Sequence, residues 1–111
     1  MPIPQGVRDR LSHDPFMKFC VMAGRWECTG AVQWHHAWIY AGRQLQEWWS
    51  IVPLCWYHHQ GGGLNREFAE YVSLMRLGKG IYAVAKKYPR FDWGARKRVL
   101  SSKFKNYHVP K

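Results

Sequence analysis

The spacing of hydrophobic and polar residues predicts three helices in the second half of the chain. Residues 65–78 have apolar positions at i, i+3, i+4 and i+7, so one face of that helix should be buried, with Asn65 as its N-cap and Gly78 as its stop. Residues 79–88 and 93–105 predict two further helices. The apolar residues expected on the first helix are Phe68, Tyr71, Val72 and Met75.

The first half of the chain predicts shorter elements. Polar, proline-broken residues 1–11 predict an extended arm, and residues 12–15 predict a turn that opens a short helix ending at Gly24. Residues 26–34 alternate loosely around a Thr-Gly turn, which predicts a β-hairpin. The run 51–55 is typical of a strand, and its internal proline favours an edge position. Together these elements indicate an α+β fold.

Length and composition exclude several classes of protein. The 111 residues suffice for one small domain, and 47% hydrophobic content is too high for a disordered chain. No apolar stretch approaches the roughly 20 residues that a membrane span needs. The N-terminus has no charged region followed by an apolar one, as a secretory signal would. We therefore expect a folded cytoplasmic protein with no membrane partner.

The net charge of +10 is concentrated in the last third of the chain. Residues 1–75 balance six basic against six acidic residues, whereas residues 76–111 carry eleven basic residues and only Asp92 as an acid. This asymmetry favours a polyanionic partner, with nucleic acid ahead of an acidic membrane surface. The alternative is a solvated basic tail that only maintains solubility. The residues expected to contact phosphates in this segment are Lys86, Lys87, Arg96, Lys97 and Arg98.

The cysteines and one histidine predict a metal site. Three cysteines cannot all form disulfides, and a reducing compartment would disfavour such bonds. Cys55 and His58 have the two-residue separation of a zinc knuckle, and Cys20 and Cys28 are the remaining thiols. We expect these four residues to bind a structural Zn²⁺. The spacing between Cys20 and Cys28 is wider than usual, so Cys20 could instead be a small buried hydrophobic residue.

A second group of histidines suggests catalytic chemistry. His35 and His36 are adjacent, so one can bind a metal while the other faces a substrate. His59 directly follows the expected zinc ligand His58, and zinc binding would therefore restrict its direction. We expect His35 and His59 to bind a second, catalytic divalent cation. A single histidine of this kind is more often a buried structural residue.

These motifs resemble a known family. Residues 33–36, a loop with Gly42 and residues 50–59 are similar to the HNH, or ββα-metal (His-Me finger), endonucleases, particularly small phage-type members with a zinc knuckle. The resemblance covers residues 20 to about 75, half of the chain. It implies a small ββα-metal domain with a structural zinc knuckle and a basic helical C-terminal extension. The implied divisions are an N-terminal arm (1–15), the nuclease domain (16–78) and the basic extension (79–111).

The resemblance also implies roles for individual residues. His35 and His59 match the two metal ligands, and His36 matches the general base that takes a proton from the attacking water. Ser50 stands where the family has an asparagine that holds the base-bearing loop, and a hydroxyl cannot reproduce a two-ended amide bridge. Gly63 stands where some branches have a third histidine ligand. Waters and phosphate would then complete the metal shell.

Elementary chemistry supports the same hypothesis of a metal-dependent DNA endonuclease. A cation with two protein ligands keeps positions open for the phosphate and the leaving oxygen, and a neutral histidine suits proton abstraction near neutral pH. Mg²⁺, Mn²⁺, Ni²⁺ or Zn²⁺ could serve, although nitrogen ligands argue mildly against Mg²⁺. Arg43 could bind the phosphate.

The partner and the alternatives follow from this hypothesis. Cutting of both strands by so small an enzyme would favour a homodimer, and a phage-encoded enzyme would act in the cytoplasm of its bacterial host. One alternative is a non-catalytic zinc-knuckle nucleic-acid-binding protein, which the serine at position 50 favours. Another is a structural protein in which zinc only stabilises the fold.

Overall fold

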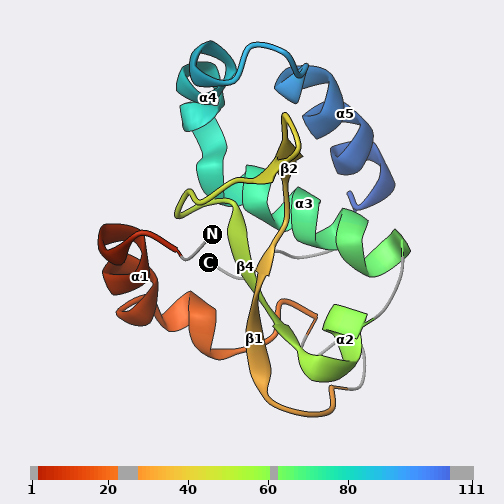
Figure 1. The fold of residues 1–111 in the computed structure, drawn as a ribbon. Helices are drawn as coiled ribbons and strands as arrows, with labels where there is room; N and C mark the ends of the chain where they lie inside the picture. The colour runs from red at the N-terminus through yellow and green to blue at the C-terminus, as the bar shows by residue number, and fades with distance from the viewer. Residues whose placement is uncertain (1–2, 23–27, 61–62, 106–111) are drawn as a thin grey trace.

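The computed structural model describes residues 3–22, 28–60 and 63–105, and these form a small mixed helix and sheet structure (Figure 1). Two antiparallel strands cross its centre, and helices from both ends of the chain surround them. The elements are α1 (Gln5–Ser12), the 3₁₀ helix η1 (Pro15–Lys18), β1 (Val32–His36), β2 (Ile39–Tyr40), β3 (Arg43–Gln44), β4 (Ile51–Cys55), α2 (Trp56–Gln60), α3 (Gly63–Leu77), the 3₁₀ helix η2 (Gly78–Gly80), α4 (Ile81–Lys87) and α5 (Trp93–Lys103).

The central sheet joins segments that are distant in the sequence. β1 pairs antiparallel with β4, with Val32 opposite Cys55 and His36 opposite Ile51. The expected hairpin within 26–34 is therefore wrong for the described part of that range, because β1 begins at Val32 and its partner is β4; residues 26–27 lie outside the described residues. The strand at 51–55 is confirmed.

A second, smaller hairpin follows β1 directly. β2 pairs with β3 across Ala41 and Gly42, whose φ angles of 52° and 79° are those of a tight two-residue hairpin turn. The backbone N–H of Leu45 then donates to the carbonyl of Trp38 at 3.0 Å, and Leu45 is buried. This hairpin brings the chain from the end of β1 back toward β4.

The N-terminal segment is helical, so the expected extended arm is wrong. α1 begins directly after Pro4, where proline does not interrupt a helix, and it buries Leu11 in the core. The turn expected at 12–15 is confirmed, because the Asp14 side chain accepts a hydrogen bond from the backbone N–H of Phe16 and caps η1. The helix end expected at Gly24 lies outside the described residues.

The long helix α3 matches its predicted range but differs in two details. It begins at Gly63, so Asn65 is inside the helix and not its cap; its amide donates to the carbonyl of His58 at 3.2 Å. Phe68, Tyr71 and Val72 are buried as expected, whereas Met75 is 42% exposed. The predicted apolar face is thus correct for its first two turns and wrong at its last position.

The two C-terminal helices are confirmed and belong to the core. Val84 of α4 and Trp93 and Leu100 of α5 are buried, and the Trp93 ring lies edge to face against Trp38 with centroids 5.0 Å apart. The basic extension therefore packs on the rest of the domain. None of the helices in the described part of the chain has the length and apolar character that a membrane crossing requires.

Candidate metal centre and adjoining histidine pocket

The four residues predicted to bind structural zinc lie together. The ligand atoms of Cys20, Cys28, Cys55 and His58 all lie within 4.8 Å of one another. The Sγ atoms of Cys20, Cys28 and Cys55 are 3.5, 3.7 and 3.1 Å from Nδ1 of His58. Usual Zn–S and Zn–N bond lengths place sulfur and nitrogen ligands about 3.6 Å apart around a tetrahedral ion. The Cys₃His cluster can therefore hold a metal ion.

The end of β4 and the start of α2 supply one side of this cluster. Cys55 is the last residue of β4, and the backbone N–H of His58, in the first turn of α2, donates to the Cys55 sulfur at 3.5 Å. On the other edge of β4, the N–H of Val21 donates to the carbonyl of Pro53 at 3.0 Å. This backbone contact fixes the neighbouring Cys20 beside the strand.

The segment before β1 supplies the third cysteine. The carbonyls of Thr29 and Ala31 accept hydrogen bonds from the N–H groups of Tyr57 and Trp56, at 3.1 and 3.0 Å. Between them, Gly30 has a φ of +88°, and a Cβ at that position would lie 2.7 Å from the Cβ of Trp56. Glycine is therefore required where this segment passes α2 and brings Cys28 to the cluster.

The thiols of the cluster lie close enough to shift one another's pKa values. Desolvation and the neighbouring Cys20 and Cys55 thiols raise the pKa of Cys28 to about 12. Burial acts to raise the pKa of Cys55 as well, but hydrogen bonds from the backbones of His58 and Thr29 outweigh it and the pKa is lowered. Burial lowers the pKa of His58, which keeps the imidazole neutral near pH 7. A bound cation would offset the negative charge of several adjacent thiolates.

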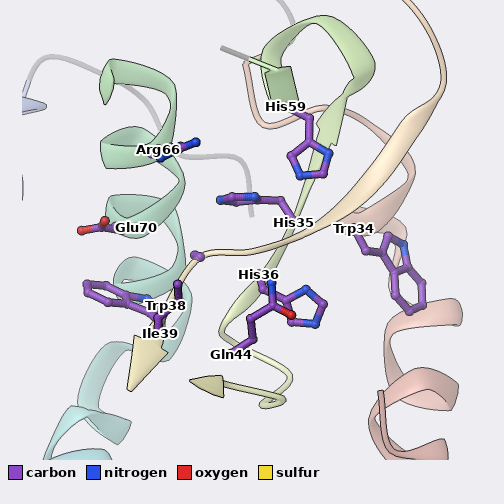
Figure 2. A pocket seen from close by; sticks show the side chains of 10 residues that line it. Trp34, His35, His36, Trp38, Ile39, Gln44, His59, Arg66 and Glu70 are labelled. Carbon is purple, nitrogen blue, oxygen red and sulfur yellow. The ribbon is translucent and has the colours of Figure 1, made fainter. Parts of the chain in front are cut away.

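A pocket of about 570 Å³ lies between β1 and α3, next to the Cys₃His cluster (Figure 2). His35, His36 and His59 all line it, so the structure brings together the three histidines expected to carry catalysis. The rings of His35 and His59 meet edge to face with centroids 5.1 Å apart. The other lining residues are Trp34, Ala37, Trp38, Ile39, Gln44, Arg66 and Glu70.

The geometry of His35 and His59 is compatible with a shared cation. Two imidazoles that bind one ion have centroids about 4.5–5.2 Å apart, given a metal–nitrogen bond of about 2.1 Å. Nδ1 of His59 lies 2.5 Å from Oε1 of Gln33, which leaves Nε2 free; metal-binding histidines usually donate their second N–H to such an acceptor. Burial, together with the charges of His59, His36 and Arg66, lowers the pKa of His35 to about 4, so its ring is neutral near pH 7.

His36 is held by a residue that the sequence did not indicate. Nε2 of His36 lies 3.0 Å from Oε1 of Gln46, in the loop that follows β3. When Nε2 donates to this oxygen, Nδ1 is the proton acceptor of the ring. This arrangement leaves His36 able to act as a base.

Ser50 is buried and anchors the same loop. Its hydroxyl donates toward the carbonyls of Leu45 and Glu47, at 3.0 and 2.9 Å, and accepts from the N–H of Glu47 at 3.1 Å. The Ser50 carbonyl accepts from the N–H of Ala37, next to His36, at 2.8 Å. Ser50 is fully buried and does not line the pocket, so its geometry fits a positioning role rather than contact with reacting atoms.

Helix α3 contributes two pocket residues that sequence reasoning missed. Figure 2 shows Arg66 reaching from α3 toward the rings of His35 and His59. Glu70, one turn later, is held by Arg96 through contacts of 2.9 and 2.8 Å. Burial raises the pKa of Glu70, and Arg96 opposes that shift. The i, i+4 spacing of Arg66 and Glu70 is the only sequence signal that could have paired them.

The predicted phosphate-binding residues divide into two groups. Lys87 pairs with Glu47 at 3.0 Å and Arg96 pairs with Glu70, so both have acidic partners within the fold. Arg43 is exposed on β3 and lies outside the histidine pocket. Four of the residues form no ion pair with any acid in the described ranges: Arg43, Lys86, Lys97 and Arg98.

Comparison of the chain with protein-family models, with curated proteins and with solved structures finds no match. Its own geometry therefore defines the class of protein. The chain is a small mixed helix and sheet protein in which a Cys₃His cluster adjoins a pocket with three histidines.

Proposed function

We propose that this protein is a metal-dependent DNA endonuclease of the ββα-metal type, which hydrolyses phosphodiester bonds. His36 is its general base, and His35 and His59 bind one divalent cation. The observation that carries the proposal is the contact between the His35 and His59 rings in a pocket that His36 and Arg66 also line.

The order of elements around the pocket supports the ββα-metal assignment. β1 and β4 are antiparallel, and α2 and α3 follow β4. His35 and His36 stand at the end of β1, whereas His59 stands in α2, directly after the strand that pairs with β1. The strand β1 and the helix α2 thus present the candidate ligands to one pocket, and β4 joins these two elements.

The pocket residues suit a phosphate substrate. A divalent cation held by two imidazoles would polarise the scissile phosphate and stabilise the leaving oxygen. Arg66 offers a guanidinium that can form two parallel hydrogen bonds with phosphate oxygens. Glu70 is engaged by Arg96, which limits its repulsion of an anionic substrate. Mg²⁺, Mn²⁺, Ni²⁺ or Zn²⁺ remains a candidate for the cation.

The hydrogen bond between His36 and Gln46 supports the role of His36 as the general base. His36 takes a proton from the attacking water at Nδ1 while Nε2–H donates to Gln46. Ser50 holds the backbone of the loop that carries Gln46, through Leu45 and Glu47. Ser50 would therefore act through Gln46, in a different way from the amide bridge of the family asparagine.

The Cys₃His cluster has a structural role in this proposal. Zn²⁺ is the ion that such a ligand set favours, and it would join the segment after η1, the segment before β1, the end of β4 and α2. Because His58 and His59 are adjacent, zinc would also orient the catalytic ligand. DNA is the proposed partner because the chain carries a net charge of +10, and cutting of both strands would favour a homodimer of so small an enzyme.

The alternative is a non-catalytic zinc-knuckle protein that binds nucleic acid. The side-chain hydrogen bonds of His36 with Gln46 and of His59 with Gln33 favour it, because each satisfies one ring nitrogen without a metal or substrate. In that case the Cys₃His cluster and the basic residues of α4 and α5 would be sufficient for nucleic-acid binding.

A plasmid-nicking assay separates the two functions. Zinc-loaded protein is incubated with supercoiled plasmid and Mg²⁺, Mn²⁺, Ni²⁺ or added Zn²⁺, in parallel with His59→Ala and the control His13→Ala. His13 is exposed at the end of α1, and its Nδ1 lies 2.7 Å from the carbonyl oxygen of Asp9 in that helix. We expect nicking by the parent and the control but not by His59→Ala, with equal zinc content in all three by elemental analysis. Salt-dependent DNA binding without nicking in any metal would establish the alternative.

A further inference from the structure

A second hollow lies between α4 and α5, away from the histidine pocket. It has a volume of about 390 Å³ and is lined by Ile81, Tyr82, Gly94, Lys97, Arg98 and Ser101. Figure 1 shows α4 at the opposite end of the molecule from α2. None of the lining residues belongs to the metal cluster or to the histidine pocket.

The hollow combines an exposed aromatic ring with unpaired positive charge. Tyr82 is 76% exposed, so most of its ring is accessible to a ligand. Lys97 and Arg98 form no ion pair with acids in the described part of the chain, whereas Arg96, on the same helix, is paired with Glu70. No acidic residue lines the hollow. Its charge is therefore complementary to an anion.

From this combination we infer that the α4–α5 hollow binds an unpaired nucleotide of a DNA strand. The base stacks on Tyr82, and Lys97 and Arg98 bind the flanking phosphates. The base must be unpaired, because the faces of bases inside a duplex are already stacked on their neighbours. A Cβ at Gly94 would lie 3.6 Å from Nη1 of Arg98 and 3.7 Å from Oδ1 of Asp92, so both groups lie beside this part of the hollow.

This inference names the substrate class of the proposed enzyme as DNA with a single-stranded segment, such as a flap or a junction. It rests on the nucleic-acid partner of the proposed function but not on hydrolysis. Binding is therefore measured without added divalent cation, and integrity of the DNA is checked on a denaturing gel. Loss of nicking in His59→Ala tests the enzyme independently.

The experiment measures fluorescence anisotropy of a labelled 12-nucleotide oligo-dT strand and of a 12-base-pair duplex with the zinc-loaded full chain. Tyr82→Ala should weaken binding of the single strand by about fivefold or more, since stacking on one aromatic ring is worth about 1–3 kcal/mol per base. Tyr82→Phe keeps the ring and should bind like the parent. Duplex binding by Tyr82→Ala should change by less than about twofold. Circular dichroism verifies that each variant is folded.

The charge contribution needs a matched control. Lys97→Gln/Arg98→Gln removes two charges from the hollow, and Arg8→Gln/Lys18→Gln removes two exposed charges from the N-terminal region. We expect the first double variant to lower the slope of log affinity against log salt by about 0.7 for each phosphate that the protein no longer neutralises, and the second to change it less. Equal decreases in the two double variants, or single-strand binding by Tyr82→Ala within twofold of the parent, would overturn the inference. An equal decrease of duplex binding in Tyr82→Ala would overturn it as well.

Discussion

The rings of His35 and His59 lie edge to face, with centroids 5.1 Å apart, although one comes from β1 and the other from α2. The neighbour of His59 in α2 is His58, whose Nδ1 faces the three cysteine sulfurs of the metal cluster. One short helix thus serves both sites. A metal ion bound to the Cys₃His cluster would fix the start of α2, and α2 presents His59 to the pocket.

Cys55→Ser tests this dependence from the metal side. The substitution removes one of four ligands, and structural zinc supplies much of the folding free energy of a small domain. We expect the purified variant to contain about one zinc ion fewer than the parent by elemental analysis and to melt at a much lower temperature or not to fold. A well-folded variant with unchanged zinc content would show that the cluster does not bind the ion.

His36→Ala tests the general base. Loss of a general base lowers the rate by roughly 10²–10⁴-fold, while DNA affinity, zinc content and melting temperature should stay close to those of the parent. His13→Ala is the matched control, because its ring bonds only the Asp9 carbonyl of its own helix in the described structure. Nicking by His36→Ala within a few-fold of the parent rate would remove His36 from the mechanism.

The parts of the site that could be predicted from sequence have local signals. The C-x-x-H spacing of Cys55 and His58 indicated a knuckle, and with only three cysteines in the chain the remaining two ligands followed. Gln33, Gln46 and Arg66 had no such signal. Their roles depend on how β1, the loop after β3 and α3 meet, which is a matter of tertiary packing.

The errors in the predicted fold also arise because tertiary packing leaves little signal in the sequence. The alternation in 26–34 was typical of a strand, but a sequence pattern does not name the partner, and β1 pairs with β4 some twenty residues later. α1 is polar on most sides, so its one fully buried residue, Leu11, left too weak a periodicity to indicate a helix. Met75 lies at i+7, only about 20° around the helix from Phe68, so the period places it on the buried face and its exposure depends on what packs near the end of α3.

Asp14→Asn tests the contact that joins the N-terminal segment to α3. Asp14 pairs with Arg76, whose guanidinium also lies over the Phe16 ring at 3.9 Å from its centroid. The substitution would leave Arg76 without its carboxylate, and we expect the free energy of unfolding at pH 7 to fall by about 1–2 kcal/mol in urea titrations. Asp9→Asn, at an exposed carboxylate of α1, should have a much smaller effect.

The ion pair of Asp14 and Arg76 also predicts that the free energy of unfolding depends on pH. Burial acts to raise the pKa of Asp14, but the hydrogen bonds from Arg76 and Phe16 and the charges of Arg76 and Arg10 outweigh it, so the pKa is below the usual value. The unfolded chain therefore takes up this proton first as the pH falls, and the stabilisation is present above about pH 4 and lost below it. The stability difference between parent and Asp14→Asn should shrink as the pH falls from 5 to 3. A difference that stays constant over this range would contradict the assignment.

Arg96→Gln separates structural from DNA-binding cations in the basic segment. Arg96 contacts Glu70 at 2.8 Å, and its loss would leave a half-buried carboxylate without a cation. We expect a decrease of about 1–2 kcal/mol in the free energy of unfolding, and a smaller loss of DNA affinity than in Lys97→Gln/Arg98→Gln. Lys86→Gln, at an exposed lysine, is the control and should leave stability unchanged. Parental stability together with a large loss of affinity in Arg96→Gln would reverse this assignment.

Gly30→Ala tests the close approach that brings Cys28 to the metal cluster. Gly30 has a φ of +88°, which costs a residue with a Cβ about 1–2 kcal/mol, and the added Cβ would lie 2.7 Å from the Cβ of Trp56. Trp56 begins α2, and its N–H is bonded to Ala31, so relief of the clash would move the backbone on one side of the cluster. We expect Gly30→Ala to lower the free energy of unfolding by about 2 kcal/mol or more and to weaken zinc retention against a competing chelator.

Gly6→Ala is the matched control, because a Cβ there meets no atom within 4 Å and alanine favours the helix α1 by about 0.5–1 kcal/mol. Equal melting temperatures and equal zinc retention in the parent and Gly30→Ala would show that this approach does not hold Cys28 in place.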